Sequence, residues 1–169
     1  KLFAADAASG SIQDRDQEIQ LAASALLVES ACSDGDFDAD ERASITAILQ
    51  SEFDLNDDET RTMIEEAEQA VQETGQLYGF TRVIKDRYTP EERVRMIEWL
   101  WQGAFADGNV DMFESNLIRR IAGLIYVSDV DRGRAKKTCP SEAWHQRKPG
   151  VSKMGELPRQ VTLLGIYGE

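Results

Sequence analysis

One acidic motif occurs twice in the chain and constrains its fold more than any other feature. The motif reads Asp-Gly-x-apolar-Asp-x-x-Glu, and it begins at Asp34 and again 73 residues later at Asp107. Each copy follows one stretch of helical spacing and precedes another. We therefore expect a duplicated helical hairpin. Its two copies should pack about a pseudo-twofold axis, because one copy alone cannot bury its apolar face.

Apolar residues recur at helical spacing up to about residue 135, and they predict an all-α fold, a single compact bundle of about seven helices. Thr89-Pro90-Glu91-Glu92 is a strong helix start, with Thr as N-cap and Pro at the first helical position. Trp99 and Trp101 are two positions apart on one helix, so we expect one in the core and one near the surface or a groove, with core packing the favoured role for the pair. The predicted helices are 16–33, 38–53, 56–73, a short one near 77–84, 89–105, 111–126 and one capped by Ser128.

Composition divides the chain into three parts. Residues 1–15 are small and polar and are expected to form a flexible lead-in, and residues 16–136 form the helical domain. Residues 137–169 form a basic tail in which Pro140, Pro149 and Pro158 interrupt any helix. Two interpretations of this tail stay open, a poorly ordered appendage and a basic segment that folds against the acidic body.

The net charge of -12 narrows the classes of partner. Such a surface repels nucleic-acid phosphates and anionic lipid headgroups, and it favours divalent cations or basic protein surfaces. No apolar stretch reaches the ~20 residues needed to cross a bilayer. Cys32 and Cys139 are too few for a disulfide framework, which fits a reducing compartment. We therefore expect a cytoplasmic protein without nucleic-acid binding or direct membrane insertion.

Helix capping accounts for most of the repeated motif. Its glycine suits the left-handed turn that ends a helix, and its second aspartate suits the N-cap of the next helix. The glutamate three positions later then completes a capping box. These residues are Gly35, Asp38 and Glu41 in the first copy and Gly108, Asp111 and Glu114 in the second.

Several acids have no capping role, and they indicate a cation site. Crowded carboxylates cost stability unless a cation neutralises them, and oxygen ligands alone favour Ca²⁺ or Mg²⁺. A standard EF-hand is excluded, because Ala39 stands where that loop needs Gly and Glu41 comes too early. No organic cofactor is expected, since the chain has no phosphate-binding Gly-rich loop. The acids concerned are Glu29, Asp34, Asp36 and Asp40 in the first copy and Asp107 in the second.

The chain resembles the bacterial tellurite-resistance TerB family, a domain also similar to the N-terminal part of DjlA-type membrane co-chaperones. The resemblance covers about residues 16–136. It rests on residues 26–45 and 99–122 around the two loops, joined by Tyr78-Gly79-Phe80-Thr81-Arg82 and Pro90-Glu91-Glu92-Arg93. It implies a compact bundle of roughly seven helices with internal pseudosymmetry. It also implies a role in tellurite or other chemical and metal stress.

The same resemblance implies divalent-cation binding through a set of acidic residues. Carried over by position, the set is Glu29, Asp34, Asp38 and Glu41 with Asp107, Asp111 and Glu114. The chain departs from a symmetric pair of sites at Gln102, which replaces the acid that Glu29 supplies in the first copy.

Two functional hypotheses follow from the sequence. In the first, the protein is a non-enzymatic stress-response protein. A divalent cation bridges its loops and fixes a surface for protein partners, including membrane-associated ones that would hold it at the inner face of the membrane. In the second, it is a protein–protein interaction module without metal, and its loop acids only cap helices. An enzyme is disfavoured, because a single histidine, His145 in the tail, gives no support to Ser-His-Asp chemistry.

Overall fold

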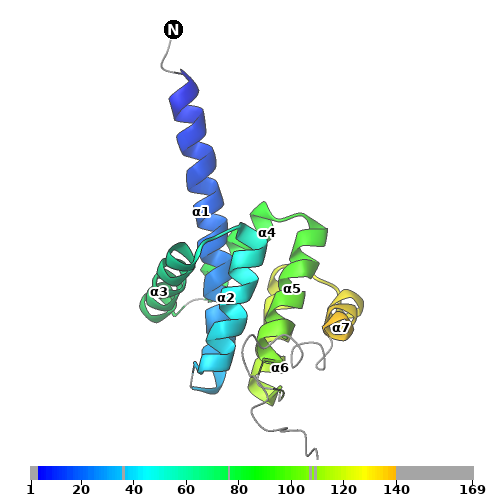
Figure 1. Cartoon of the computed structure of the whole chain (residues 1–169). Helices are drawn as coiled ribbons and strands as arrows, with labels where there is room; N and C mark the ends of the chain where they lie inside the picture. Colours follow the sequence, from blue (N-terminus) through cyan, green and yellow to red (C-terminus); the bar gives the residue numbers. More distant parts are fainter. Residues whose placement is uncertain (1–3, 36, 76, 107, 109, 140–169) are drawn as a thin grey trace, which may run out of the picture.

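The computed structural model describes residues 4–139 except residues 36, 76, 107 and 109, with side chains from residue 14 onward apart from that of residue 34. These residues form an all-α bundle, as predicted, and no strand occurs among them (Figure 1). The elements are α1 (Ala4–Ala31), the 3₁₀ helix η1 (Cys32–Asp34), α2 (Ala39–Phe53), α3 (Asp57–Thr74), α4 (Leu77–Arg87), α5 (Pro90–Ala104), α6 (Met112–Leu124) and α7 (Asp129–Thr138).

Helix α1 begins earlier than the apolar spacing predicts. The sequence places its start near Asp16, whereas the helix begins at Ala4 and includes most of the expected lead-in. Four of the first five helical residues are alanine, which has the highest helix propensity, so the helix forms there without an apolar stripe. The N-terminal part of α1 extends beyond the other helices (Figure 1).

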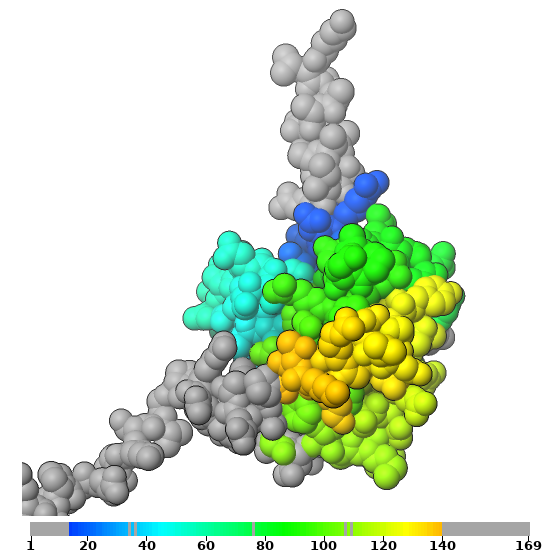
Figure 2. All heavy atoms as spheres, turned by 90° about the vertical axis from the view of Figure 1, so that its right-hand side faces the viewer, coloured from blue at the N-terminus to red at the C-terminus, as the bar shows by residue number. Residues whose placement is uncertain are grey.

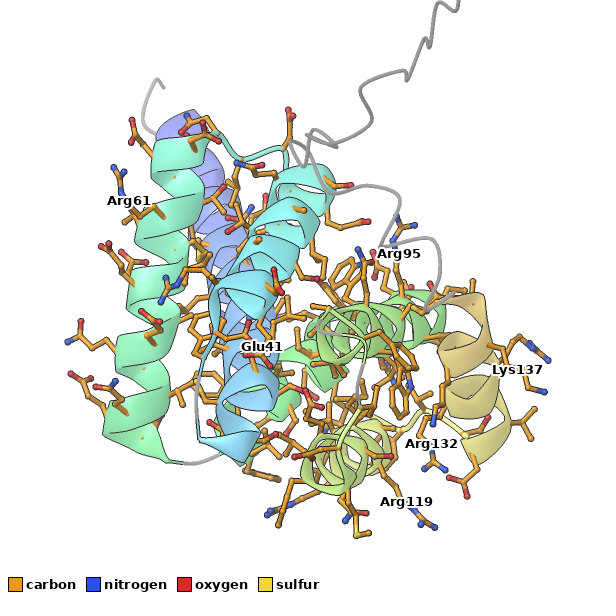
Figure 3. The ribbon with its side chains drawn as sticks, turned by 60° about the horizontal axis from the view of Figure 1, so that its bottom comes forward. Glu41, Arg61, Arg95, Arg119, Arg132 and Lys137 are labelled. Carbon is orange, nitrogen blue, oxygen red and sulfur yellow. The ribbon has the colours of Figure 1, made fainter. Side chains whose placement is uncertain are left out.

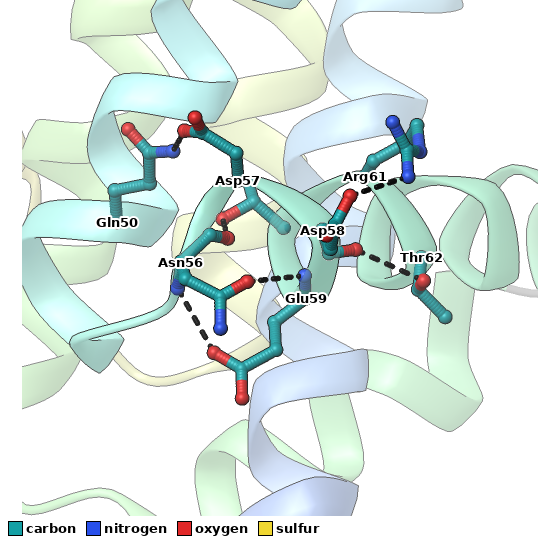
Figure 4. A network of polar contacts seen from close by, with 8 residues as sticks. Gln50, Asn56, Asp57, Asp58, Glu59, Arg61 and Thr62 are labelled. Carbon is teal, nitrogen blue, oxygen red and sulfur yellow. Dashed lines mark hydrogen bonds and ion pairs between the residues drawn. The ribbon is translucent and has the colours of Figure 1, made fainter.

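Capping boxes define the starts of four helices, α2, α3, α5 and α6, at the residues that the sequence indicates. At α3, the Asn56 side chain accepts a hydrogen bond from the Glu59 N–H at 3.0 Å, and the Glu59 carboxylate accepts one from the Asn56 N–H at 2.9 Å (Figure 4). Each cap satisfies backbone groups that the helix leaves unpaired, and its loss costs about 0.5–2 kcal/mol.

Helices α1 and α5 form the centre of the bundle. Helix α1 packs against α2, α3, α4 and α5, while α5 also packs against α6 and α7. Helix α7 covers the outside of α5, at the right of Figure 1 and facing the viewer, in orange, in Figure 2.

Both tryptophans of α5 are buried. The core role favoured for the pair is confirmed, whereas the expectation that one of them would lie near the surface was wrong. Trp99 packs edge to face against Phe53 of α2, with ring centroids 5.9 Å apart. Trp101 stacks on Phe105, and the ammonium group of Lys136 in α7 lies over the Trp101 ring, 4.6 Å from its centroid. Helix α2 covers the side of α5 that carries Trp99, and α7 covers the side that carries Trp101. Both indole rings are therefore shielded from water.

Candidate acidic loop site

The two acidic loops lie at the same end of the bundle, the lower end in Figure 1. One loop joins α1 to α2 and the other joins α5 to α6. Element η1 of the first loop packs against α6, which follows the second loop, while α2 packs against α5. In addition, the Ser44 hydroxyl of α2 donates a hydrogen bond to the Gln102 carbonyl of α5 at 3.5 Å. These are contacts that a pseudo-twofold arrangement would produce, although the symmetry itself stays a prediction.

Gly35 and Gly108 adopt the left-handed backbone conformation that the motif predicts, with φ of +106° and +87°. Each N–H donates a 3.1 Å hydrogen bond to a carbonyl of the preceding turn, to Cys32 and Phe105 respectively. A side chain at these φ values would be strained, so glycine is the residue that allows each loop to reverse direction.

The four capping residues of the motif occupy the positions that the sequence predicts. In the first loop, the Asp38 side chain accepts from the Glu41 N–H at 2.8 Å, and the Glu41 carboxylate accepts from the Asp38 N–H at 3.0 Å. In the second loop, Asp111 and Glu114 form the same pair at 3.0 and 3.1 Å. The capping interpretation is therefore confirmed for all four.

Glu41 and Glu114 are buried, with 6 % and 4 % of their surfaces exposed. Figure 3, in which the loop end is turned towards the viewer, labels Glu41 near the start of α2. Both residues have a further interaction beyond these capping hydrogen bonds, so burial leaves neither of them without a partner.

The structure does not describe every residue of the predicted site. Asp107 and Asp36 lie outside the described residues, and so does the side chain of Asp34, whose backbone ends η1. Glu29 is half-buried in the last two turns of α1. At the corresponding place in α5 is Gln102, which is also half-buried.

Comparison with known families decides the identity of this bundle. A family model described as tellurite resistance protein TerB matches residues 20–137. The chain belongs to the TerB family. The match begins within α1 and ends in α7, so the TerB domain contains both acidic loops. Membership relates the chain to tellurite resistance. No curated protein and no solved structure matches the chain.

The described part of the TerB domain contains no group of three or more His, Cys, Asp or Glu side chains arranged to hold a metal ion. The side chains of Asp34 and Asp107 lie outside the described part of the chain, so the set of cation ligands stays a prediction. Along the described helices, none is both long and apolar enough to cross a membrane.

Two serines beside the first loop of the TerB domain are additional candidates that sequence reasoning missed. The hydroxyl oxygens of Ser30, in α1, and Ser33, in η1, are buried and have no hydrogen-bond partner among the described residues. Such groups normally find a partner, because an unsatisfied hydroxyl costs about 1–3 kcal/mol. At the corresponding places in the second copy are Gly103 and Ala106, which carry no hydroxyl. A comparison of the two copies could have found this difference.

The thiol of Cys139, which follows the region matched by the TerB family model, has little nucleophilic character. The Cys139 thiol donates a hydrogen bond to the carbonyl of Glu98 at 3.2 Å. Burial, with a smaller contribution from the negative charge of Glu98, raises the pKa of Cys139 to about 11. A thiol of this kind is protonated near neutral pH, so it lacks the thiolate that a nucleophile or metal ligand needs.

Proposed function

We propose that this TerB-family protein is a non-enzymatic protein of the response to tellurite and related chemical stress, and that it binds a hard divalent cation at its acidic loops. The observation that carries the proposal is the placement of both loops at one end of the bundle, with η1 of the first loop against α6 of the second. Carboxylates from two distant parts of the sequence thereby share one region of the molecule.

The donor set favours Ca²⁺ or Mg²⁺. It consists of carboxylate and hydroxyl oxygens, which are the ligands of hard cations, and the described loop region offers no histidine. The first loop is the richer of the two, since Glu29, Ser30 and Ser33 have Gln102, Gly103 and Ala106 as their counterparts. We therefore place the ion chiefly on the first loop, with Asp34 and Glu41. The second loop contributes Asp107 and Glu114.

A bound cation would act by holding the two loops together. Neutralising the crowded acids would stabilise this end of the bundle and fix the surface that a protein partner recognises. A partner associated with the inner face of the membrane would bring the protein to that membrane without insertion, which matches the acidic surface of the domain.

Calorimetric titration with Ca²⁺ and Mg²⁺, paired with thermal unfolding, tests the proposal. A specific site raises stability by RT ln(1 + [L]/Kd), whereas screening affects all salts of equal ionic strength alike. The matched variant replaces Asp34 and Asp107 by Asn, which preserves size and leaves the capping boxes intact. We expect binding in the native protein and its loss in the variant. An equal response of both proteins would exclude the site.

A second function is favoured by one observation, the complete capping boxes at both loops. In this case the acids serve only to start α2 and α6, and the domain is a metal-free protein-interaction module. It predicts no heat of binding for either cation and no rise in melting temperature beyond that produced by NaCl at the same ionic strength.

A further inference from the structure

Two neighbouring grooves run along α1 at the end of the bundle away from the acidic loops. The α1–α3 groove, of about 880 Å³, is formed by α1 and the first half of α3. The α1–α5 groove, of about 510 Å³, is bordered by α1, the end of α2 and the start of α5. Asp16 and Gln20 of α1 line both grooves, so the two grooves adjoin at this helix.

Both grooves carry more acidic than basic side chains. The α1–α5 groove has Asp16, Glu52 and Glu92 beside Arg95, which is paired with Glu52, and in the α1–α3 groove Glu18 is paired with Arg87. Asp14, Asp16 and Glu66 make no hydrogen bond or ion pair within the described part of the chain. At the start of α3, Asp58 and Glu59 are held by Arg61 and by the capping box (Figure 4). Six carboxylates and no cationic side chain line the α1–α3 groove: Asp14, Asp16, Glu18, Asp58, Glu59 and Glu66.

The floors of the grooves are apolar. In the α1–α3 groove the floor consists of Leu21, Leu55 and Met63, which are all half-buried. The α1–α5 groove is lined by three aromatic side chains, Phe53, Tyr88 and Trp99. A simple ion would use only the carboxylates. A surface with acidic walls and an apolar, partly aromatic floor instead suits a peptide that carries both cationic and apolar side chains.

The tail of this chain has that composition. Residues 143–155 contain Arg147, Lys148 and Lys153 without any acidic residue. The same stretch also contains the apolar side chains Trp144, Val151 and Met154.

The last described residue, Cys139, lies close to the grooves. Cys139 ends the described residues beside α5, where its thiol contacts the Glu98 carbonyl. Glu98 is next to Trp99 in sequence and three residues after Arg95, and both of these line the α1–α5 groove. Residues three apart on a helix are neighbours on its surface. Gly155 lies sixteen positions after Cys139, and an extended chain of that length spans roughly 50 Å, enough to follow both grooves.

We propose that residues 143–155 bind intramolecularly in the two grooves. Trp144 packs against the aromatic floor of the α1–α5 groove, and the three basic side chains face the carboxylates of α1 and α3. This inference does not depend on cation binding at the loops, which lie at the opposite end of α1.

Heteronuclear {¹H}–¹⁵N NOE values of residues 143–155 in the full chain test the proposal. At low salt we expect values close to those of α5. In the double variant Asp16→Asn with Glu66→Gln we expect them to fall markedly. The matched control, Glu65→Gln with Glu73→Gln, removes two exposed charges from α3 outside the grooves and should keep the native values. Raising the ionic strength to about 1 M, where the Debye length is about 3 Å, should release the tail in the native chain.

A second variant changes the tail instead of the groove, and the signals of the groove residues are observed. Arg147→Glu, Lys148→Glu and Lys153→Glu together should shift the amide signals of residues 16–20 while leaving α6 unchanged. Tail NOE values that are the same in the native chain and the groove variant would overturn the proposal. Shifts confined to the tail would do so as well. Signals that depend on protein concentration would place the tail on a second copy and would also overturn the intramolecular arrangement.

Discussion

The hydroxyl of Ser44 donates a hydrogen bond to the backbone carbonyl of Gln102 at 3.5 Å, and so links the helix after the first acidic loop to the helix before the second. Ser44 is fully buried where α2 meets α5. The two loops therefore keep their relative position through packing between α2 and α5 as well as through η1 and α6.

Replacing Ser44 by Ala should destabilise the protein by about 0.5–1.5 kcal/mol, the usual net value of one hydrogen bond. Urea unfolding measures this difference. Ser51→Ala, at an exposed position of the same helix, is the control and should change the free energy of unfolding by less than about 0.5 kcal/mol. Equal effects of the two substitutions would mean that the link between α2 and α5 contributes nothing.

Asp111→Ala should cost about 0.5–2 kcal/mol, because α6 loses the side chain that accepts from the N–H groups of Phe113 and Glu114. Asn can make the same hydrogen bonds, so Asp111→Asn should retain most of the stability. Thermal unfolding without divalent cations compares the three proteins. A loss as large for Asn as for Ala would assign the effect of Asp111 to its charge instead of its capping role.

Ser30→Ala separates the stability of the first loop without added cation from its affinity for a cation. The Ser30 hydroxyl has no hydrogen-bond partner among the described residues, so removing it should leave the cation-free melting temperature unchanged or raise it. The rise in melting temperature on adding Ca²⁺ should shrink if the hydroxyl is a ligand. Gly103→Ser is the reverse substitution, because it introduces a hydroxyl at the corresponding place before the second loop. A cation response that Ser30→Ala does not alter would remove this serine from the site.

The Cys139 thiol should make the stability fall at alkaline pH. Burial raises its pKa from 9.0 to about 11 in the folded protein, so the folded state holds the proton more tightly than the unfolded state. The stabilisation is complete below pH 9 and is lost as the pH rises from 9 towards 11. Cys139→Ser titrates nowhere in this range. The difference in free energy of unfolding between the native protein and this variant, measured in urea at pH 8 and pH 11, should therefore decrease. A constant difference would contradict the raised pKa.

Helix starts could be read from the sequence because their signals are local. Thr89, Asn56 and Asp111 each precede a Glu at the third following position, and each forms the capping box that this spacing predicts. The start of α1 was missed, since alanine propensity supports residues 4–15 without any apolar periodicity. The glycine conformations at both loops were equally predictable, because a left-handed turn depends on only a few residues.

The candidate site was only partly predictable. The motif indicated Asp38, Glu41, Asp111 and Glu114, but each proved to cap a helix, and spacing could not reveal that Glu41 and Glu114 are also buried. Ser30 and Ser33 gave no signal, since a serine in a helical pattern is ordinary until its surroundings are known.

By itself, then, the sequence determined the helical class, most helix boundaries, the capping boxes and membership of the TerB family, because these depend on residues close together along the chain. Tertiary structure decided which surfaces are covered. It buried both Trp99 and Trp101, brought the two loops to one end, and left acidic grooves on either side of Asp16. Those outcomes depend on how helices far apart in sequence pack against one another, and apolar spacing shows which face of a helix is buried but not which helix covers it.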